Sequence, residues 1–424
     1  MIFYIYIENI QIISTRIAIN RLVFYTLNRY KLKTKSTLFY TLLFATCFGM
    51  MFSSCNSNKT SYSGSDTSDS VALFITGMDP RLGDRKFEQV PAIGTSADGK
   101  QIFVAWYSGG AAPGPGNYVT LSVSQDAGKT WLNNQLAIYP KLPEYRIFDP
   151  AFWRDKNGQL HLFFGSVKDS LIWDGFGGVN HLEIAWSGAK ITHSESKRMI
   201  NGVMSNKPLY LASKDLALFP VYVDKPLSGD SSGKAFPENG AFIHILDYAK
   251  SNDLSSVTKY SSIQIADSIR IHDEPQLVEI SDKGNLMAMV RTTKGIYYST
   301  SSDYGKNWTP VEPFTASGPT TSSRFYLGKL ASGNLLLISN SSTTRNNMTA
   351  FISKDGGKTW PHRLLLDARE NVSYPDADQT PDGKIHVVFD RERTSAKDIL
   401  YCRFTEEDII KGSTEMVFKM RVNK

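Results

Sequence analysis

Short apolar runs recur along the chain, and a turn glycine precedes each one by a few residues. The runs cover residues 102–106 after Gly99, 160–164 after Gly158, 286–290 after Gly284, 335–338 after Gly333 and 385–389 after Gly383. Four or five apolar or alternating residues behind a glycine turn are typical of β-strands in hairpins. We therefore predict a protein built of antiparallel hairpins.

The spacing of these turns predicts the fold. Gly284 and Gly333 lie 49 residues apart, and Gly333 and Gly383 lie 50 residues apart. A period near 50 residues with several short strands in each unit is typical of the blades of a β-propeller. The 354 residues from Val71 to Lys424 allow six blades of about 59 residues each, with room for insertions. The prediction is an all-β, six-bladed propeller over residues 71–424, with an exposed loop at 227–233 and one short helix near 405–411.

A second repeat has the pattern S-x-D-x-G-x-[TN]-W and occurs at residues 124–131, 301–308 and 353–360. Asp and Gly favour a tight turn between two strands, because Asp accepts hydrogen bonds from the turn and Gly adopts positive φ. The Trp is expected to pack beneath the turn. We assign Asp126, Asp303 and Asp355 to structure and not to chemistry.

The N-terminal region has a different character. An apolar run at residues 36–51 follows a basic stretch at 31–35 and precedes Cys55. This order predicts a bacterial lipoprotein signal over residues 1–55, with cleavage before Cys55 and a lipid on its sulfur; an uncleaved membrane anchor is the alternative. Residues 56–70 are rich in Ser, Asn and Thr and predict a flexible tether. The protein would then be an exported, membrane-anchored lipoprotein in the periplasm or at the cell surface.

Composition excludes several functions. Part of the net charge of +6 belongs to the N-terminal region, so the propeller is nearly neutral and nucleic acid is not an expected partner. Cys402 is the only cysteine of residues 71–424, which precludes an intradomain disulfide. The seven histidines form no metal-binding motif, and no phosphate loop, dinucleotide fingerprint or G-x-S-x-G is present. We expect a monomer without metal or cofactor.

The repeated S-x-D-x-G-x-[TN]-W turn resembles the Asp box, or BNR repeat, of sialidase-like β-propellers, and among them a bacterial subgroup of glycosyl hydrolases. The resemblance implies a Tyr nucleophile, a Glu that activates it, an Asp acid/base and three Arg residues that bind a carboxylate. Carried onto this sequence in the family order, it implies Glu274 as base, Arg291 and Arg345 as carboxylate ligands, and Tyr374 as nucleophile.

The chain departs from the family pattern at two places. Gln89 occupies the position of the first family arginine, and the strand at 103–110 lacks the usual carboxylate. Asp149 is the preferred replacement acid, and Asp376 is the second choice. The remaining predicted substrate-binding residues are Gln89, Asn206, Lys207, Arg324 and Asp376. Asn206, Lys207 and Arg324 lie in turn motifs at blade-length spacing, and we expect Lys207 and Arg324 to compensate for the lost arginine.

These residues lead to one expected function and two alternatives. We expect an exo-acting glycoside hydrolase that removes a terminal, acidic, sialic-acid-like sugar from a glycan with retention of configuration. One alternative is a glycan-binding propeller without activity. The other is a polysaccharide lyase in which Tyr374 or His272 removes a proton next to a uronate. Each site residue also has a structural interpretation: packing for Tyr374, turn capping for Glu274, and ion pairing for Arg291 and Arg345.

Overall fold

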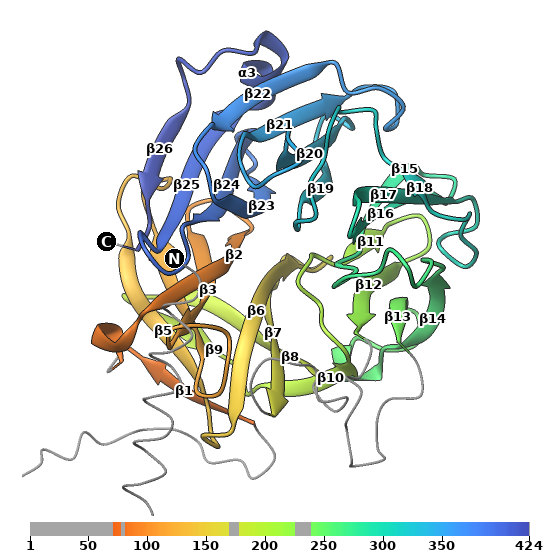
Figure 1. Ribbon diagram of the computed structural model, residues 1–424. Helices are drawn as coiled ribbons and strands as arrows, with labels where there is room; N and C mark the ends of the chain where they lie inside the picture. The colour runs from red at the N-terminus through yellow and green to blue at the C-terminus, as the bar shows by residue number, and fades with distance from the viewer. Residues whose placement is uncertain (1–70, 78–80, 169–177, 225–238, 424) are drawn as a thin grey trace, which may run out of the picture. The chain divides into compact units, whose positions relative to one another are not determined.

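Six antiparallel sheets follow one another in chain order around a ring (Figure 1), in a computed structural model that describes residues 71–77, 81–168, 178–224 and 239–423. The predicted six-bladed propeller is confirmed. The predicted lipoprotein signal with Cys55, the tether at 56–70 and the loop at 227–233 lie outside the described residues.

Each blade begins with an inner strand and proceeds outward through antiparallel neighbours. Blade one consists of β2 (Phe87–Thr95), β3 (Ile102–Gly109), β4 (Tyr118–Ser124), β5 (Leu132–Pro140) and β1 (Ala72–Thr76). Blade two consists of β6 (Tyr145–Arg154), β7 (Leu160–Lys168), β8 (Gly178–Ser187), β9 (Lys190–His193) and β10 (Lys197–Asn201). Blade three consists of β11 (Leu209–Leu211), β12 (Leu216–Val223), β13 (Gly240–Asp247) and β14 (Thr258–Ile263). Blade four consists of β15 (Gln276–Ser281), β16 (Asn285–Thr292), β17 (Gly295–Ser301) and β18 (Glu312–Pro313). Blade five consists of β19 (Tyr326–Lys329), β20 (Leu335–Asn340), β21 (Met348–Ser353) and β22 (His362–Asp367). Blade six consists of β23 (Val372–Gln379), β24 (Lys384–Arg391), β25 (Asp398–Thr405) and β26 (Phe418–Arg421).

The predicted glycine turns join the first and second strands of five blades, and the five predicted apolar runs lie in β3, β7, β16, β20 and β24. Blade three makes the same turn without glycine. There Asp215 has a φ of 55°, and its carboxylate accepts hydrogen bonds from Lys156 (2.8 Å) and from the Tyr210 hydroxyl (2.7 Å). Asp tolerates this conformation better than most residues. The glycine pattern therefore missed one blade.

The three Asp boxes join the third and fourth strands of blades one, four and five, and each turn packs against the preceding blade. In the first box, Asp126 accepts hydrogen bonds from the Thr130 amide (2.8 Å) and from the Ser124 hydroxyl (2.9 Å). The Ala127 carbonyl then accepts from Tyr401 of blade six (3.2 Å). In the second box, Trp308 donates to Ser261 of blade three (3.1 Å). The predicted structural role of the boxes is thus borne out, and it includes holding neighbouring blades together.

Carboxylates of blade six close the ring onto blade one. Asp376, Asp378 and Asp390 accept hydrogen bonds from the backbone amides of Ile93 (2.8 Å), Thr95 (2.9 Å) and Val90 (2.9 Å), in that order. Hydrogen bonds that backbone amides donate to ionised carboxylates are stronger than bonds between neutral groups. The closure therefore rests on side chain to backbone bonds between β2 and blade six.

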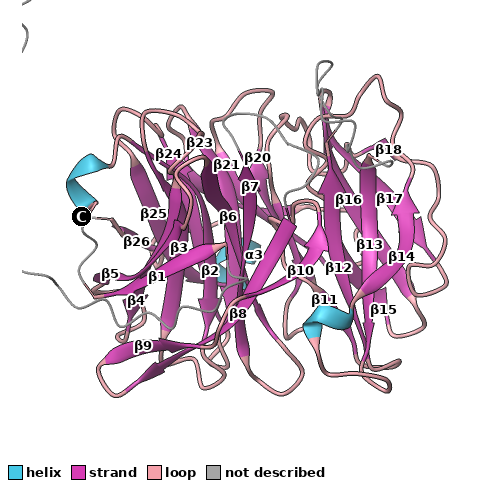
Figure 2. Ribbon diagram, turned by 90° about the horizontal axis from the view of Figure 1, so that it is seen from below, coloured by secondary structure: helices cyan, strands magenta, loops and turns pink. Residues whose placement is uncertain are grey.

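Helices are few among the described residues, as Figure 2 shows. The predicted C-terminal helix is confirmed as α3 (Glu406–Lys411), and two single 3₁₀ turns are η1 (Leu82–Asp84) and η2 (Leu254–Ser256). Thr405 caps α3 through a reciprocal capping box with Asp408, and Gly412 ends it with a φ of 66°.

Candidate active site

One register position recurs in all six blades, within the inner strand in blades one, two and six and just before it in blades three, four and five. In each blade one residue of the inner strand pairs with the beginning of the second strand, and the shared position lies five residues before it. These reference residues are Thr95, Arg154, Leu211, Glu279, Lys329 and Gln379. The residues at this position are Val90, Asp149, Asn206, Glu274, Arg324 and Tyr374. Equivalent positions in a ring of blades lie at the same level along the axis. Five of these six residues were predicted from the sequence as site residues. The exception is Val90, which directly follows the predicted site residue Gln89.

Four of the six residues have left-handed backbones and precede a proline. The φ angles are 50° for Val90, 45° for Asp149, 40° for Glu274 and 55° for Tyr374. In blades one, two and six the strand pairing is interrupted at this dipeptide. Proline lacks the amide that would continue the ladder, and a bulge turns the side chain away from its regular direction. The ladder is thus broken at the positions where Asp149 and Tyr374 face the cavity described below.

Arg291 joins the predicted nucleophile and the predicted base. Its Nη1 donates to the Tyr374 hydroxyl (2.8 Å) and lies 3.2 Å from Oε2 of Glu274. All three side chains are buried. Burial, and next the Glu274 carboxylate, raise the pKa of Tyr374, so its phenol is neutral in the resting site. The structure has the two side chains bridged by Arg291 rather than bonded directly to each other.

Asp149 lines the same cavity as Glu274 and Tyr374. The cavity has a volume of about 230 Å³, and Gln89, His272 and Arg393 are among its other lining residues. Burial raises the pKa of Asp149 to about 6, with a further contribution from the Glu274 carboxylate. Two carboxyl groups with different environments thus share one cavity, which is the arrangement expected of an acid and a base.

Three further guanidinium groups lie near the Tyr374 ring. The Cζ atoms of Arg393, Arg324 and Arg345 are 4.4 Å, 5.2 Å and 5.3 Å from its centroid. Burial, and next the Arg393 charge, lower the pKa of Arg345. A crowded cluster of cations of this kind favours an anionic ligand, because the ligand relieves their mutual repulsion.

Four residues that were predicted to bind substrate form hydrogen bonds or ion pairs with other protein groups, and they are Asn206, Arg324, Lys207 and Asp376. Asn206 donates to the carbonyls of Glu274 (2.9 Å) and Pro275 (3.0 Å). Arg324 donates to the carbonyls of Ser205 (2.9 Å), Pro91 (2.6 Å) and Tyr374 (3.2 Å).

Lys207 bonds the carbonyl of Ile93 (2.5 Å) and the carboxylate of Asp376 (3.0 Å), and it lines a separate hollow of about 330 Å³. These contacts tie the inner strands together. Substrate binding by Asn206, Arg324, Lys207 and Asp376 stays a prediction.

Sequence reasoning missed part of the cavity lining, namely Arg393, Tyr222 and Asp224. Arg146 lines the cavity too, and so does His272, which the sequence suggests as a base and whose ring lies 2.7 Å from Asp224. A count back from the turn glycines would have found the shared register position, which lies nine residues before Gly99, Gly158, Gly333 and Gly383 and ten before Gly284. No repeat marks Arg393, which follows β24 in an irregular turn.

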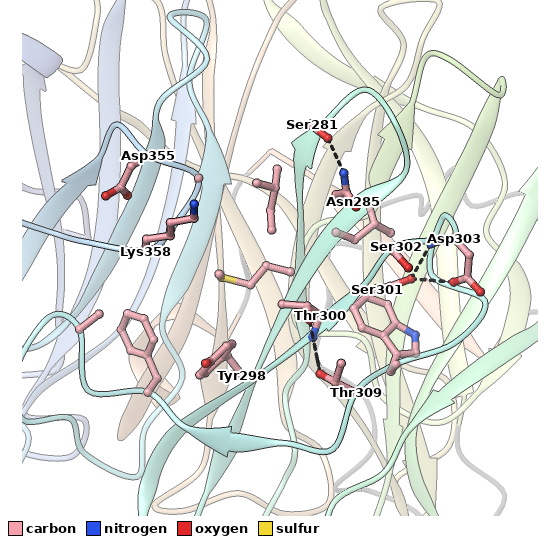
Figure 3. Close-up of a pocket in the computed structure, with 18 of the residues that line it drawn as sticks. Ser281, Asn285, Tyr298, Thr300, Ser301, Ser302, Asp303, Thr309, Asp355 and Lys358 are labelled. Carbon is pink, nitrogen blue, oxygen red and sulfur yellow. Dashed lines mark hydrogen bonds between the residues drawn. The ribbon is translucent and has the colours of Figure 1, made fainter.

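A larger hollow lies away from the axis, between blades four and five (Figure 3). Its volume is about 860 Å³, and Figure 3 shows Asp355 and Lys358 on one side of it and Asp303 on the other. Asp355 and Asp303 already bind the hydroxyl and amide groups of their own Asp-box turns. We place the candidate active site in the smaller cavity, which Asp149, Glu274 and Tyr374 line together.

Two structural searches were confined to the described residues. Within residues 71–423, gaps excepted, no cluster of three or more His, Cys, Asp or Glu side chains could hold a metal ion. Within the same part of the chain, no helix is long and apolar enough to cross a membrane.

The fold and the site define a sialidase-like propeller. A family model described as a BNR repeat-like domain matches residues 100–387, and the chain belongs to this family. Among solved structures, the Hadza microbial sialidase Hz136 superposes with a TM-score of 0.59 at 17% identity, over 77% of this chain and 67% of that one.

Two further structures share the fold. A K499G mutant of the NanB sialidase from Streptococcus pneumoniae gives a TM-score of 0.59 at 14% identity, over 80% of this chain and 71% of that one. An α-L-arabinanase from Penicillium chrysogenum gives 0.53 at 15%, over 80% and 98%. No curated protein sequence matches the chain. At these identities the structures show the fold alone, and it is a fold on which glycoside hydrolases are built.

Proposed function

We propose that the protein is an exported, lipid-anchored, exo-acting glycoside hydrolase that removes a terminal acidic sugar from glycans with retention of configuration. The observation that carries the proposal is the arrangement at Arg291, where one nitrogen contacts both the Tyr374 hydroxyl and the Glu274 carboxylate. Asp149, with its raised pKa, lines the same cavity. A nucleophile, a base and an acid therefore face one space.

In the first step the Tyr374 oxygen attacks the anomeric carbon. Its proton passes to Glu274, which the shared Arg291 nitrogen keeps beside it. The glycosidic bond breaks as Asp149 protonates the departing oxygen, and a glycosyl-tyrosine forms. A phenol suits a sugar with a carboxylate at its anomeric carbon, because a neutral nucleophile is not repelled by that charge.

In the second step water attacks the same carbon from the side of the departed group. Asp149, now ionised, accepts a proton from the water, and the Tyr374 oxygen leaves and recovers its proton from Glu274. Two inversions give net retention. Arg291 and Arg345 orient the substrate carboxylate, since a guanidinium binds a carboxylate through two parallel hydrogen bonds.

The test is replacement of the nucleophile. Tyr374→Phe removes the attacking oxygen and preserves the ring, so turnover of a glycan found by library screening should fall at least about 10³-fold. Tyr298→Phe is the matched control, because its hydroxyl bonds Glu312 (3.2 Å) beside the outer hollow. Unchanged turnover by Tyr374→Phe on the same substrate would refute the mechanism. Binding of an acidic glycan without turnover by the wild type would select the glycan-binding alternative.

One observation favours a lyase as the second candidate. His272 lines the cavity, and its hydrogen bond to Asp224 raises the pKa of the imidazole, which makes it a stronger base than a free histidine. A lyase would release an unsaturated uronate that absorbs ultraviolet light. Such a product, lost in His272→Ala and retained in Tyr374→Phe, would replace the hydrolase proposal.

A further inference from the structure

The end of the second strand, or the turn that follows it, supplies an arginine in each of three consecutive blades. Arg291 is the last residue but one of β16 in blade four, Arg345 lies between β20 and β21 in blade five, and Arg393 lies between β24 and β25 in blade six. All three approach Tyr374: Arg291 at its hydroxyl (2.8 Å), and the other two at its ring (5.3 Å and 4.4 Å). The three guanidinium groups therefore surround the proposed nucleophile.

Arg393 is held beside the position that carries Gln89. Its carbonyl accepts a hydrogen bond from the amide of Glu88 (3.0 Å). Its guanidinium pairs with Asp390 (3.2 Å), and Asp390 in turn accepts from the amide of Val90 (2.9 Å). Contacts on both flanks of Gln89 thus fix the turn of blade six against blade one, and Arg393 and Gln89 line the same cavity.

We propose that Arg393 is the third carboxylate-binding residue of the site and that it supplies, from blade six, the charge that Gln89 does not supply from blade one. The inference rests on the proposed function, and it narrows the substrate to a sugar whose carboxylate is attached at the anomeric carbon. Such a carboxylate lies next to the carbon that Tyr374 attacks, and Arg291, Arg345 and Arg393 all contact the Tyr374 side chain.

Arg146 is the rival for this role. It also lines the cavity, is buried, and has an Nε without a hydrogen-bond partner in the described residues. However, its guanidinium stacks on Phe148 (4.5 Å) and its Nη1 contacts the Tyr107 hydroxyl (3.4 Å), so it does not share the Tyr374 ring with the other three. The experiment includes Arg146→Gln so that the two arginines can be distinguished.

The experiment compares an acid with its ester in the full-length protein. Sialic acid and its methyl ester are titrated calorimetrically, and the aryl α-glycosides of both are assayed for hydrolysis. Arg393→Gln should weaken binding of the acid and raise its KM by about 10- to 100-fold, the usual loss for a charge-assisted hydrogen bond. Binding of the ester should change by less than about threefold. Arg391→Gln is the matched control, because Arg391 ends β24 two residues before Arg393 and pairs with Asp398 (2.9 Å) and Glu392 (3.0 Å).

Two more variants separate recognition from folding. Arg393→Gln leaves the buried Asp390 without its cation, so it is also made together with Asp390→Asn, and circular dichroism checks the fold. Gln89→Arg combined with Arg393→Gln returns a guanidinium to blade one and should restore at least about a tenfold preference for acid over ester. A merely structural Arg393 would not be rescued in this way.

The results separate the two proposals. Equal loss of acid and ester in Arg393→Gln, or loss of acid preference in Arg146→Gln alone, overturns the role of Arg393. A wild type that binds the acid selectively without hydrolysing its glycoside refutes the hydrolase proposal, and the calorimetric comparison still decides the role of Arg393. A wild type that binds acid no better than ester overturns both.

Discussion

Asp149→Asn would remove the proposed general acid with little change in shape. Burial raises the pKa of Asp149 to about 6 from its ordinary value of 3.8. At pH 7 a group with a pKa of 6 is about one-tenth protonated, whereas a pKa of 3.8 would leave about 1 part in 1,600 in the acid form. The cavity therefore increases the supply of acid at neutral pH more than about 100-fold.

The assay is the pH dependence of kcat/KM on two substrates. With an alkyl glycoside, whose leaving oxygen needs a proton, the wild type should lose activity about tenfold per pH unit above pH 6. Asp149→Asn should be slower by about 10²- to 10⁴-fold on this substrate and should lose the alkaline limb. With a nitrophenyl glycoside, whose leaving group needs no proton, the variant should retain most of the rate of glycosyl-tyrosine formation. An unshifted alkaline limb in Asp149→Asn would refute the assignment, and Asp376→Asn would then be the next variant to test.

The same pKa predicts the sign of a stability change. Between pH 3.8 and about 6 the folded state binds more protons at Asp149 than the unfolded state, so this group costs stability as pH rises through that window. A shift of about 2 pKa units corresponds to about 3 kcal/mol, or about 2 kcal/mol after allowance for the partial exposure of the side chain. Asp149→Asn should therefore be more stable than the wild type at pH 7 and no more stable at pH 3.5, by urea denaturation.

Two further predictions concern the frame around the site. Gly357 and Gly333 have nearly equal φ angles, 88° and 89°, but a Cβ on Gly357 would lie 2.6 Å from Met287 Cε, whereas one on Gly333 would meet open space. In urea unfolding, Gly357→Ala should therefore lower the free energy of unfolding by about 2 kcal/mol and Gly333→Ala by about 1 kcal/mol. Equal losses would contradict the packing of the third Asp box on blade four. Lys207→Met leaves the Asp376 carboxylate without its cation and should lower the free energy of unfolding by about 2–3 kcal/mol. A second change, Asp376→Asn, should recover most of this loss. Additive losses in the double variant would show that the pair is not coupled.

The sequence predicts most of the fold because its repeats have a local physical cause. A turn glycine and an Asp box each specify a hairpin from a few adjacent residues, and five blades contain such a glycine. Blade three escapes the pattern because Asp215 adopts the left-handed turn without glycine, with help from Lys156 and Tyr210. Tyr210 belongs to the same hairpin, but Lys156 lies in a turn of blade two, so the local sequence does not reveal the whole set of contacts.

The candidate site is predictable in part for the same reason. Glu274, Arg291 and Tyr374 follow a family order, and the structure brings them together. Whether a buried cation faces a ligand or a carbonyl depends on contacts between distant blades. Arg324 binds carbonyls from three blades, and Arg393 reaches the cavity because blade six closes onto blade one. Neither outcome has a signal in the local sequence.

The strain at the site and the closure of the ring depend on the same bonds. Left-handed backbones before proline at Val90 and Tyr374 each cost about 1–3 kcal/mol and persist only where the surroundings fix them. Asp390 binds the amide of Val90, and Arg324 binds the carbonyls of Pro91 and Tyr374. Blades one and six are thus joined at the strained residues themselves. It follows that loosening this junction should displace the Tyr374 oxygen from Arg291 before it unfolds either blade, so activity should be lost at lower denaturant concentrations than secondary structure.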